Sequence, residues 1–276
     1  MPINSWRAIL YDVLLYRRLI ALQIRAQLQY KINIFVDIST YLAVTVLEFG
    51  ALLLYFGPFP SLLGWKIGEV ALLAAIMSIG FGLAELTGAG IDNFSDTIRR
   101  GEFDRVLLRP VGAFTQVIGS DFRLRRFGRI TQGIIAFIIA LRLLPDLHWT
   151  AAKLLILPLS IVSGALIFLS ILLLGATLCF WTVETTELTN ILTYGGREML
   201  SYPITIYNQT LQRFFLFVVP IAFGSYAPAC YILGRPLPFG ISSSVAFAAP
   251  LIALAFALVA GIIWSFGVNR YQSTGS

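Results

Sequence analysis

LLILPLSIVSGALIFLSILLLGATLCFW, residues 154–181, is a run without a single Asp, Glu, Lys or Arg. About 20 apolar residues in a helix cross the hydrocarbon core of a bilayer, so this run predicts a transmembrane helix. The rest of the chain has the same character, because 58% of its 276 residues are hydrophobic and only 12% are charged. Soluble domains carry about 25% charged residues, so the sequence predicts an integral membrane protein.

Five further apolar segments accompany this run. They are Ile34–Phe56, Ile67–Leu86, Ile130–Leu144 with a polar lead-in from Phe114, Phe214–Leu233 and Val245–Phe266. Each is long enough, or nearly long enough, to cross a bilayer as a helix. The pattern predicts an all-α integral membrane protein with six transmembrane helices, forming a single domain over residues 1–276.

The basic residues are unevenly divided between the segments that connect these runs. Most lie before the first run, after the second or after the last: Arg7, Arg17, Arg18, Arg25, Lys31, Arg99, Arg100, Arg105, Arg109, Arg123, Arg125, Arg126, Arg129 and Arg270. The opposite side carries only Lys66, Arg142, Lys153 and Arg235. Because basic residues concentrate on the cytoplasmic side, we expect both termini in the cytoplasm. This bias also explains the net charge of +6, so no nucleic-acid partner is predicted.

Residues 1–32 predict an amphipathic helix that lies on the membrane surface. An apolar stripe at helical spacing would face the lipid while arginines reach lipid phosphates. The stripe consists of Trp6, Ile9, Leu10, Val13, Ile20 and Ile24. Such a helix either anchors the chain or has a coupling role, and the pattern leaves both open.

The sequence offers no catalytic, metal or cofactor site of its own. His148 is the only histidine, and Cys179 and Cys230 are far apart, which argues against a zinc or redox centre. The three lysines are each followed by Ile or Leu, so the Gly-Lys-Ser/Thr of a phosphate-binding loop is absent. ATP-driven work would therefore require a separate ATPase.

The segment 89–112 predicts two short cytoplasmic helices. The first carries Asp92 and Asp96 early and Arg99 and Arg100 late, which suits the helix dipole, and it ends at Gly101. The second runs from Glu102 to Leu108 and ends before Pro110. Together they make a compact protrusion that another protein could bind. The alternative is a basic loop that lies on lipid headgroups.

The run Arg100-Gly-Glu-Phe-Asp-Arg-Val-Leu-Leu-Arg-Pro110 resembles the arginine-glycine-x-x-aspartate-x-x-leucine-x-arginine-proline segment of bacterial ABC transporter type 2 permeases. The chain end, Arg270-Tyr-Gln-Ser-Thr-Gly-Ser276, resembles the closing tyrosine-x-serine-x-glycine of the six-span subunits in that family. Pro203, Pro220 and Pro228 resemble the prolines that mark their return after the fifth span.

This resemblance implies a permease subunit of an exporter in the bacterial plasma (inner) membrane. Such a subunit forms half of a dimer with itself or with a sister permease. It contacts a separate cytoplasmic ATPase, which binds ATP and Mg²⁺, through the N-terminal helix and the loop between spans two and three. The implied coupling residues are Asp96, Arg99, Arg100, Gly101, Asp104 and Arg109.

A polar stretch follows residue 182. On a helix, Glu187, Asn190, Tyr194 and Arg197 share one face, which either lies on the cytoplasmic surface or lines a pathway between subunits. In the second interpretation, favoured by the resemblance, residues 182–201 form span five. Residues 202–240 are then a re-entrant outer element before span six, instead of containing a fifth span at Phe214–Leu233.

Glu48 lies near the middle of the first apolar segment, where an ionised side chain is costly. We expect it to face protein, either as a pathway-lining residue or as a structural carboxyl at the subunit seam. Two other functions stay open: an ion-coupled secondary transporter, for which the sequence shows no internal repeat, and a non-transporting membrane scaffold.

Overall fold

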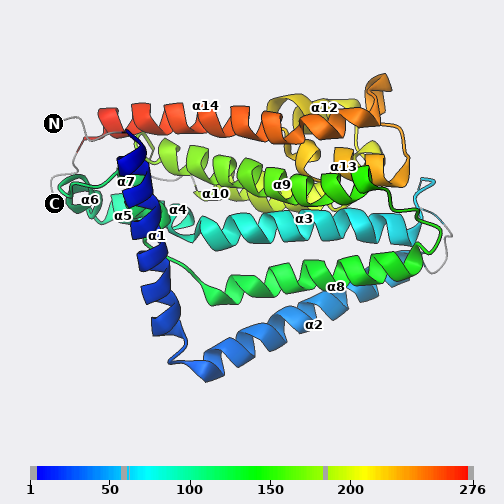
Figure 1. Cartoon of the computed structure of the whole chain (residues 1–276), viewed down its shortest axis with the longest axis horizontal. Helices are drawn as coiled ribbons and strands as arrows, with labels where there is room; N and C mark the ends of the chain where they lie inside the picture. Colours follow the sequence, from blue (N-terminus) through cyan, green and yellow to red (C-terminus); the bar gives the residue numbers. More distant parts are fainter. Residues whose placement is uncertain (1–4, 57–60, 62, 183–185, 273–276) are drawn as a thin grey trace.

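The computed structural model describes residues 5–56, 61, 63–182 and 186–272. The regular elements in these ranges are all helices, which confirms the predicted all-α class. Five long helices lie side by side in the order α2, α8, α3, α9, α14 (Figure 1). Their bounds are α2 Lys31–Phe56, α8 Phe127–Leu143, α3 Ile67–Thr87, α9 Ala151–Leu178 and α14 Ala249–Arg270.

Three described helical segments have the length and apolar composition needed to cross a membrane. They are Ile67–Thr87, Ala151–Leu178 and Ser243–Arg270. A further candidate is a bent pair, Tyr11–Gln27 with Lys31–Glu48, whose halves meet at 92°. Helix α8 has 17 residues, short of a full bilayer crossing without tilt or neighbouring protein. The prediction of six spans therefore stays a prediction beyond these helices.

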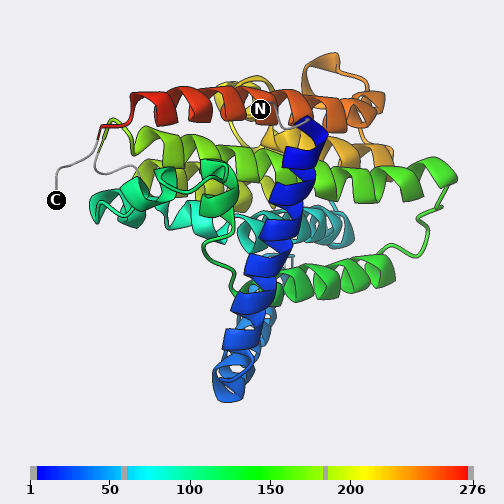
Figure 2. The same ribbon diagram turned by 60° about the vertical axis from the view of Figure 1, so that its left-hand side comes forward.

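Helix α1 (Ser5–Gln27) lies across one end of the bundle instead of along it (Figure 2). Of the predicted apolar stripe, Ile20 and Ile24 are half-buried and Val13 is exposed, and the position of the helix on a membrane surface stays a prediction. The half-buried face contacts the loop between α3 and α8, which is described below. The side chains of Trp6, Ile9 and Leu10, and residues 1–4 of the predicted 1–32 segment, lie outside the described part of the chain.

Short helices fill the end of the bundle where α1 lies. They are α4 (Ala89–Asp92), α5 (Phe94–Arg99), α6 (Phe103–Leu107), α7 (Ala113–Ile118) and the 3₁₀ turn η1 (Leu124–Arg126). The polar lead-in from Phe114 was expected to join the third apolar segment. It does not, because α7 ends at Ile118 and α8 begins only at Phe127.

The opposite end is formed by residues 201–248. Its main elements are η3 (Ile204–Ile206), α12 (Gln209–Arg213), η4 (Phe214–Val218), η5 (Ile221–Gly224), α13 (Tyr226–Leu233), η6 (Pro238–Gly240) and η7 (Ser243–Ala248). The interpretation of Phe214–Leu233 as one spanning helix is wrong, because the helix breaks at Val219 and Pro220 and again at Ser225. A proline cannot donate the backbone hydrogen bond that helix continuation needs.

The residues of this end enter the main hydrophobic core between α3 and α9. Tyr226, Ala222 and Ile232 are fully buried with Leu72 and Ile167. Gly224 packs directly on Gly164 of α9, where a Cβ on Gly224 would overlap the Gly164 backbone. The two glycines thus permit a close approach that no larger residue would allow.

Residues 186–200 form one helical segment in three parts: α10 (Thr186–Asn190), the π-helical turn η2 (Ile191–Gly195) and α11 (Gly196–Leu200). The segment packs against α9 at its start and against α3 at its end. It therefore runs along the bundle, as the pathway interpretation of residues 182–201 requires. Residues 183–185 of that range lie outside the described part.

Candidate functional site

In the loop between α3 and α8, the two helices predicted for residues 89–112 correspond to α5 and α6, and the one-turn helix α4 precedes them. Gly101 adopts a left-handed conformation with φ +67°. Its amide donates to Ile98 O at 3.0 Å and the Glu102 amide donates to Thr97 O at 3.0 Å, which together close the end of α5. Glycine is needed here because other residues adopt this conformation at a cost.

The outer surface of this loop is charged and partly apolar. The predicted coupling residues Asp96, Arg99, Arg100 and Arg109 are exposed, and so are Glu102 and Arg105. Leu108 is 86% exposed among them. An exposed leucine ringed by charges is typical of a protein-binding surface, although a single exposed apolar residue is also common.

The inner side of the same loop packs against the bundle through an aromatic cluster. Phe94 of α5 and Phe103 of α6 are fully buried and meet edge to face, with their ring centroids 5.2 Å apart. Both rings contact Phe180, which follows α9. Phe94 also packs on Trp264 of α14 at 5.1 Å. The loop is thereby fixed to two long helices through large aromatic contacts.

Tyr271 joins this cluster from the chain end. Its ring lies 5.0 Å from that of Phe103. Burial, together with the neighbouring carboxylate of Asp104, raises the pKa of Tyr271. Asp104 is thus half-buried and turned toward Tyr271, whereas the other charged coupling residues are exposed. Tyr271 of the chain end and Phe103 and Asp104 of the segment 100–110, both of which carry the family resemblance, meet at this point.

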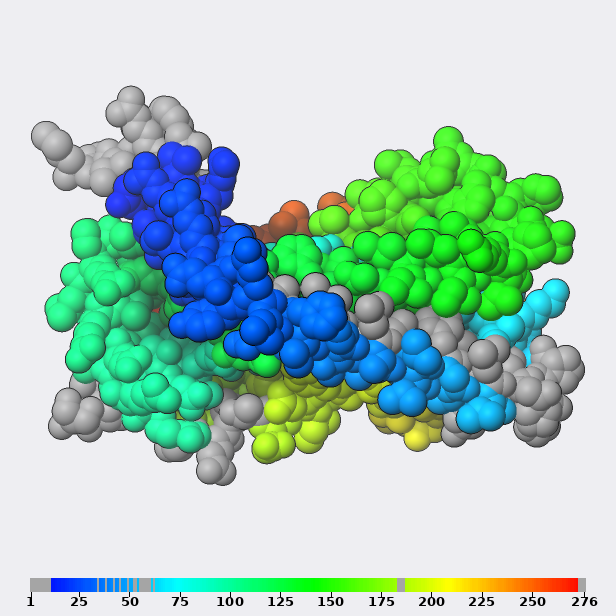
Figure 3. All heavy atoms as spheres, turned by 90° about the horizontal axis from the view of Figure 1, so that it is seen from below, coloured from blue at the N-terminus to red at the C-terminus, as the bar shows by residue number. Residues whose placement is uncertain are grey.

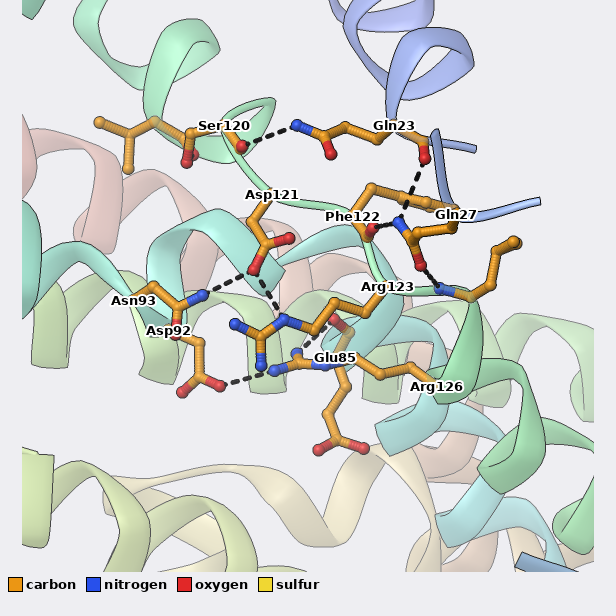
Figure 4. Close-up of polar contacts among 12 residues, drawn as sticks. Gln23, Gln27, Glu85, Asp92, Asn93, Ser120, Asp121, Phe122, Arg123 and Arg126 are labelled. Atoms are coloured by element: carbon orange, nitrogen blue, oxygen red, sulfur yellow. Dashed lines mark hydrogen bonds and ion pairs between the residues drawn. The ribbon is translucent and has the colours of Figure 1, made fainter. Parts of the chain in front are cut away.

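A polar network ties the N-terminal helix to the loop (Figure 4). Gln23 donates to Ser120 O at 3.2 Å, and Gln27 donates to Phe122 O and accepts from the Leu124 amide at 2.8 Å. From the far side, Asp121 accepts from Asn93 at 2.7 Å. In the space-filling view, α1 (dark blue) lies against the surface formed by the loop (green) (Figure 3).

The network continues into the base of α3. Arg126, which is buried, pairs with Asp92 at 2.8 Å and donates to Glu85 O at 2.6 Å. Arg123 pairs with Asp121 at 2.7 Å. Two of the basic residues that indicated the cytoplasmic side are therefore internal structural partners. The sequence carried no signal for these pairs, since the partners are up to 41 residues apart.

Two of the predicted pathway residues, Glu48 and Arg197, share one cavity. Arg197 is buried, and its Nη2 lies 3.6 Å from Glu48 Oε1. Gln132 donates to Glu48, and Glu198 pairs with Arg197. The cavity, of about 140 Å³, is lined by Glu48, Ala51, Ala71, Ala74, Ser78, Gln132, Ala136, Arg197, Glu198, Ser201 and Tyr202.

The other pathway residues lie elsewhere. Asn190 and Tyr194 line a second pocket together with Asp96 and Arg99 of the coupling loop. Glu187 is exposed and lines neither pocket. Asn190 and Arg197 are about two helical turns apart along the segment, so residues that share one face can line different pockets. A helical wheel does not show this separation along the axis.

A layer of polar and aromatic side chains lies along the bundle between the two pockets. Tyr194 donates to Glu85 Oε1 at 3.0 Å, and Arg129 pairs with Glu85 Oε2 at 2.7 Å. Phe81 packs edge to face on Tyr194 with centroids 5.3 Å apart, and Arg129 lies over the Phe81 ring. In the chain, Glu85 lies between Ser78 of the cavity and Asp92 of the second pocket.

Sequence reasoning did not identify Glu85, Arg129, Gln132 and Glu198 as members of these sites. Arg129 was counted only among the basic residues that indicate the cytoplasmic side. The one signal for Glu85, Arg129 and Gln132 is that each is a polar residue beside or within an apolar run, where such residues turn toward protein or water. Glu198 lies in the polar stretch after residue 182 and carries no such signal.

Comparisons with known proteins identify the family. A family model described as ABC-2 family transporter protein matches residues 42–275. No curated protein and no solved structure matches the chain. The matched range includes the two-helix loop, the residues of both pockets and the aromatic cluster. The chain belongs to the ABC-2 family of transporter proteins.

Proposed function

We propose that the chain is the permease subunit of an ATP-driven exporter in a bacterial plasma membrane. In this proposal it forms half of the translocation pathway, together with a second permease subunit that is a copy of itself or a sister chain. A separate cytoplasmic ATPase binds ATP and Mg²⁺ and docks on the loop 89–112. Membership of the ABC-2 family supports the partnership with an ABC ATPase.

The observation that carries the proposal is the buried aromatic packing that fixes the loop to α9 and α14. A loop that only lies on headgroups needs no rigid connection to the bundle, whereas a loop that transmits force does. Phe94 and Phe103 connect α5 and α6 to α9 and α14 through buried aromatic contacts. Displacement of the loop by an ATPase would then move these helices as a unit, since packed cores shift between discrete arrangements.

The two pockets suggest where the substrate passes. The cavity at Arg197 and the pocket at Asp96 lie along one helical segment, with the layer of Glu85, Arg129 and Tyr194 between them. In the proposal, ATPase action opens this layer, so that the cavity is exposed alternately to the two sides. Arg99 and Asp96 lie in both the docking loop and the lower pocket, which links docking to opening.

A pull-down of the ATPase tests the proposal. The chain is co-expressed with the ATPase encoded beside it, identified by Gly-x-x-x-x-Gly-Lys-Ser/Thr. Arg100→Glu and Arg109→Glu reverse exposed charges of the loop and should abolish co-purification while membrane insertion is unchanged. Arg142→Glu, an exposed arginine at the far end of α8, is the matched control. Full ATPase binding by both loop variants would overturn the docking assignment.

A further inference from the structure

We infer that the cavity between Glu48 and Arg197 binds an organic cation, a protonated amine on an apolar body. The inference rests on the proposed function, because it assigns a substrate class to the pathway cavity. Its residues come from α2, α3, α8 and α11, so the site exists only in the folded bundle.

The charge balance of the cavity is the first argument. Glu48 and Glu198 face a single guanidinium, that of Arg197, and Gln132 contributes no charge. Arg129, about one turn before Gln132 on α8, is already paired with Glu85. The cavity therefore holds one more negative charge than positive charge. In surroundings of low dielectric constant, a ligand cation would be favoured there and an anion would be disfavoured.

The second argument is the exposure of the two carboxylates relative to their partner. The Arg197 side chain is only 8% exposed, whereas those of Glu48 and Glu198 are 46% and 60% exposed. The fixed positive charge thus lies behind two more exposed carboxylates, whose oxygen atoms keep lone pairs beyond their contacts with Arg197 and Gln132. A protonated amine entering the cavity meets acceptors first.

The third argument is the lining of the cavity beside these charges. Its walls include Ala51, Ala71, Ala74 and Ala136, small side chains that leave space for the apolar body of the amine.

Equilibrium binding of tritium-labelled 2-phenylethylamine to the full chain in lipid nanodiscs tests the inference, with empty nanodiscs subtracted. 2-Phenylethanol has nearly the same shape and keeps a hydroxyl but carries no charge. We expect the alcohol to compete about tenfold less well or worse, because a charge-assisted hydrogen bond is worth about 1.5–3 kcal/mol. Glu48→Gln and Glu198→Gln should each weaken amine binding, and the double variant should lose it. Asp146→Asn, an exposed carboxylate outside the cavity, should bind as the unaltered chain does.

Equal affinity for amine and alcohol, or undiminished amine binding by the Glu198→Gln variant, would overturn the assignment. Glu198 is largely exposed, so its replacement does not endanger the fold, and gel filtration checks this. The assay needs neither ATPase nor ATP. Failure of amine binding with intact ATPase docking would reject the cation site alone, whereas amine binding without ATPase docking would reject the exporter proposal alone.

Discussion

The two ends of the helical bundle are both built from short helices, but they are held in different ways. At the loop end, residues 89–126, the outer surface is charged and the inner side is fixed by aromatic rings, ion pairs and hydrogen bonds to α1. At the opposite end, residues 201–248, buried apolar side chains continue the main core without interruption. There Arg235 pairs with Glu69 and stacks on Trp65, 4.6 Å from its ring centroid.

This difference indicates different tasks. The loop end packs on α9 and α14 through a small cluster of its own, so its displacement would move these two helices with it. The opposite end shares the main core and cannot move without disturbing it. In the proposed exporter, the loop end therefore has the moving, protein-binding role and the opposite end a static role.

The largest effect is expected from removing a ring of the aromatic cluster that fixes the loop to the bundle. Phe103→Ala empties a fully buried ring position and should cost about 3–5 kcal/mol of local stability. The arginine-rich loop should become sensitive to trypsin, and ATPase binding should fall, while the bundle stays folded. Leu108→Ala removes an exposed side chain and is the control. Unchanged trypsin resistance in the Phe103 variant would contradict the claim that the aromatic cluster fixes the loop.

A smaller but more global effect is expected at the opposite end. Gly224→Ala places a methyl group against the Gly164 backbone and should cost about 1–3 kcal/mol. Because this end shares the main core, thermal unfolding of the whole chain should shift to lower temperature. Gly261→Ala, whose added methyl group meets open space, is the control and should be neutral or stabilising. If the Gly224 variant instead loses the trypsin resistance of its loop and keeps its unfolding temperature, the opposite end does not share the main core in the way described.

The smallest effect is expected at Tyr271. Its raised pKa means that folding favours the neutral phenol, so this contribution is present below the ordinary value near 10 and is lost as pH rises through the raised pKa. Trypsin protection of the loop should therefore weaken at strongly alkaline pH. Tyr271→Phe should remove that pH dependence and change stability at neutral pH by at most about 1 kcal/mol. An identical alkaline profile in both proteins would argue that Tyr271 does not hold the loop.

Local features of this fold were predictable from sequence. The apolar runs located the long helices to within a few residues, and the dipole pattern with Gly101 located α5 and α6. These signals act over neighbouring residues. The pairs Arg126–Asp92 and Arg129–Glu85 join residues that only the folded bundle brings together, so no local pattern predicts them.

The side of the membrane on which each end of the bundle lies tests the proposed pathway most directly. Single cysteines are placed at Arg109 of the loop end and at Gln209 of the opposite end, both exposed, in a background with Cys179→Ala and Cys230→Ala. A membrane-impermeant thiol reagent is then applied to intact cells. The account predicts labelling of the Gln209→Cys variant from outside, and labelling of the Arg109→Cys variant only after the membrane is opened. Labelling of residue 209 only in opened cells would contradict the account, because residues 186–200 could then not cross the membrane to line a pathway.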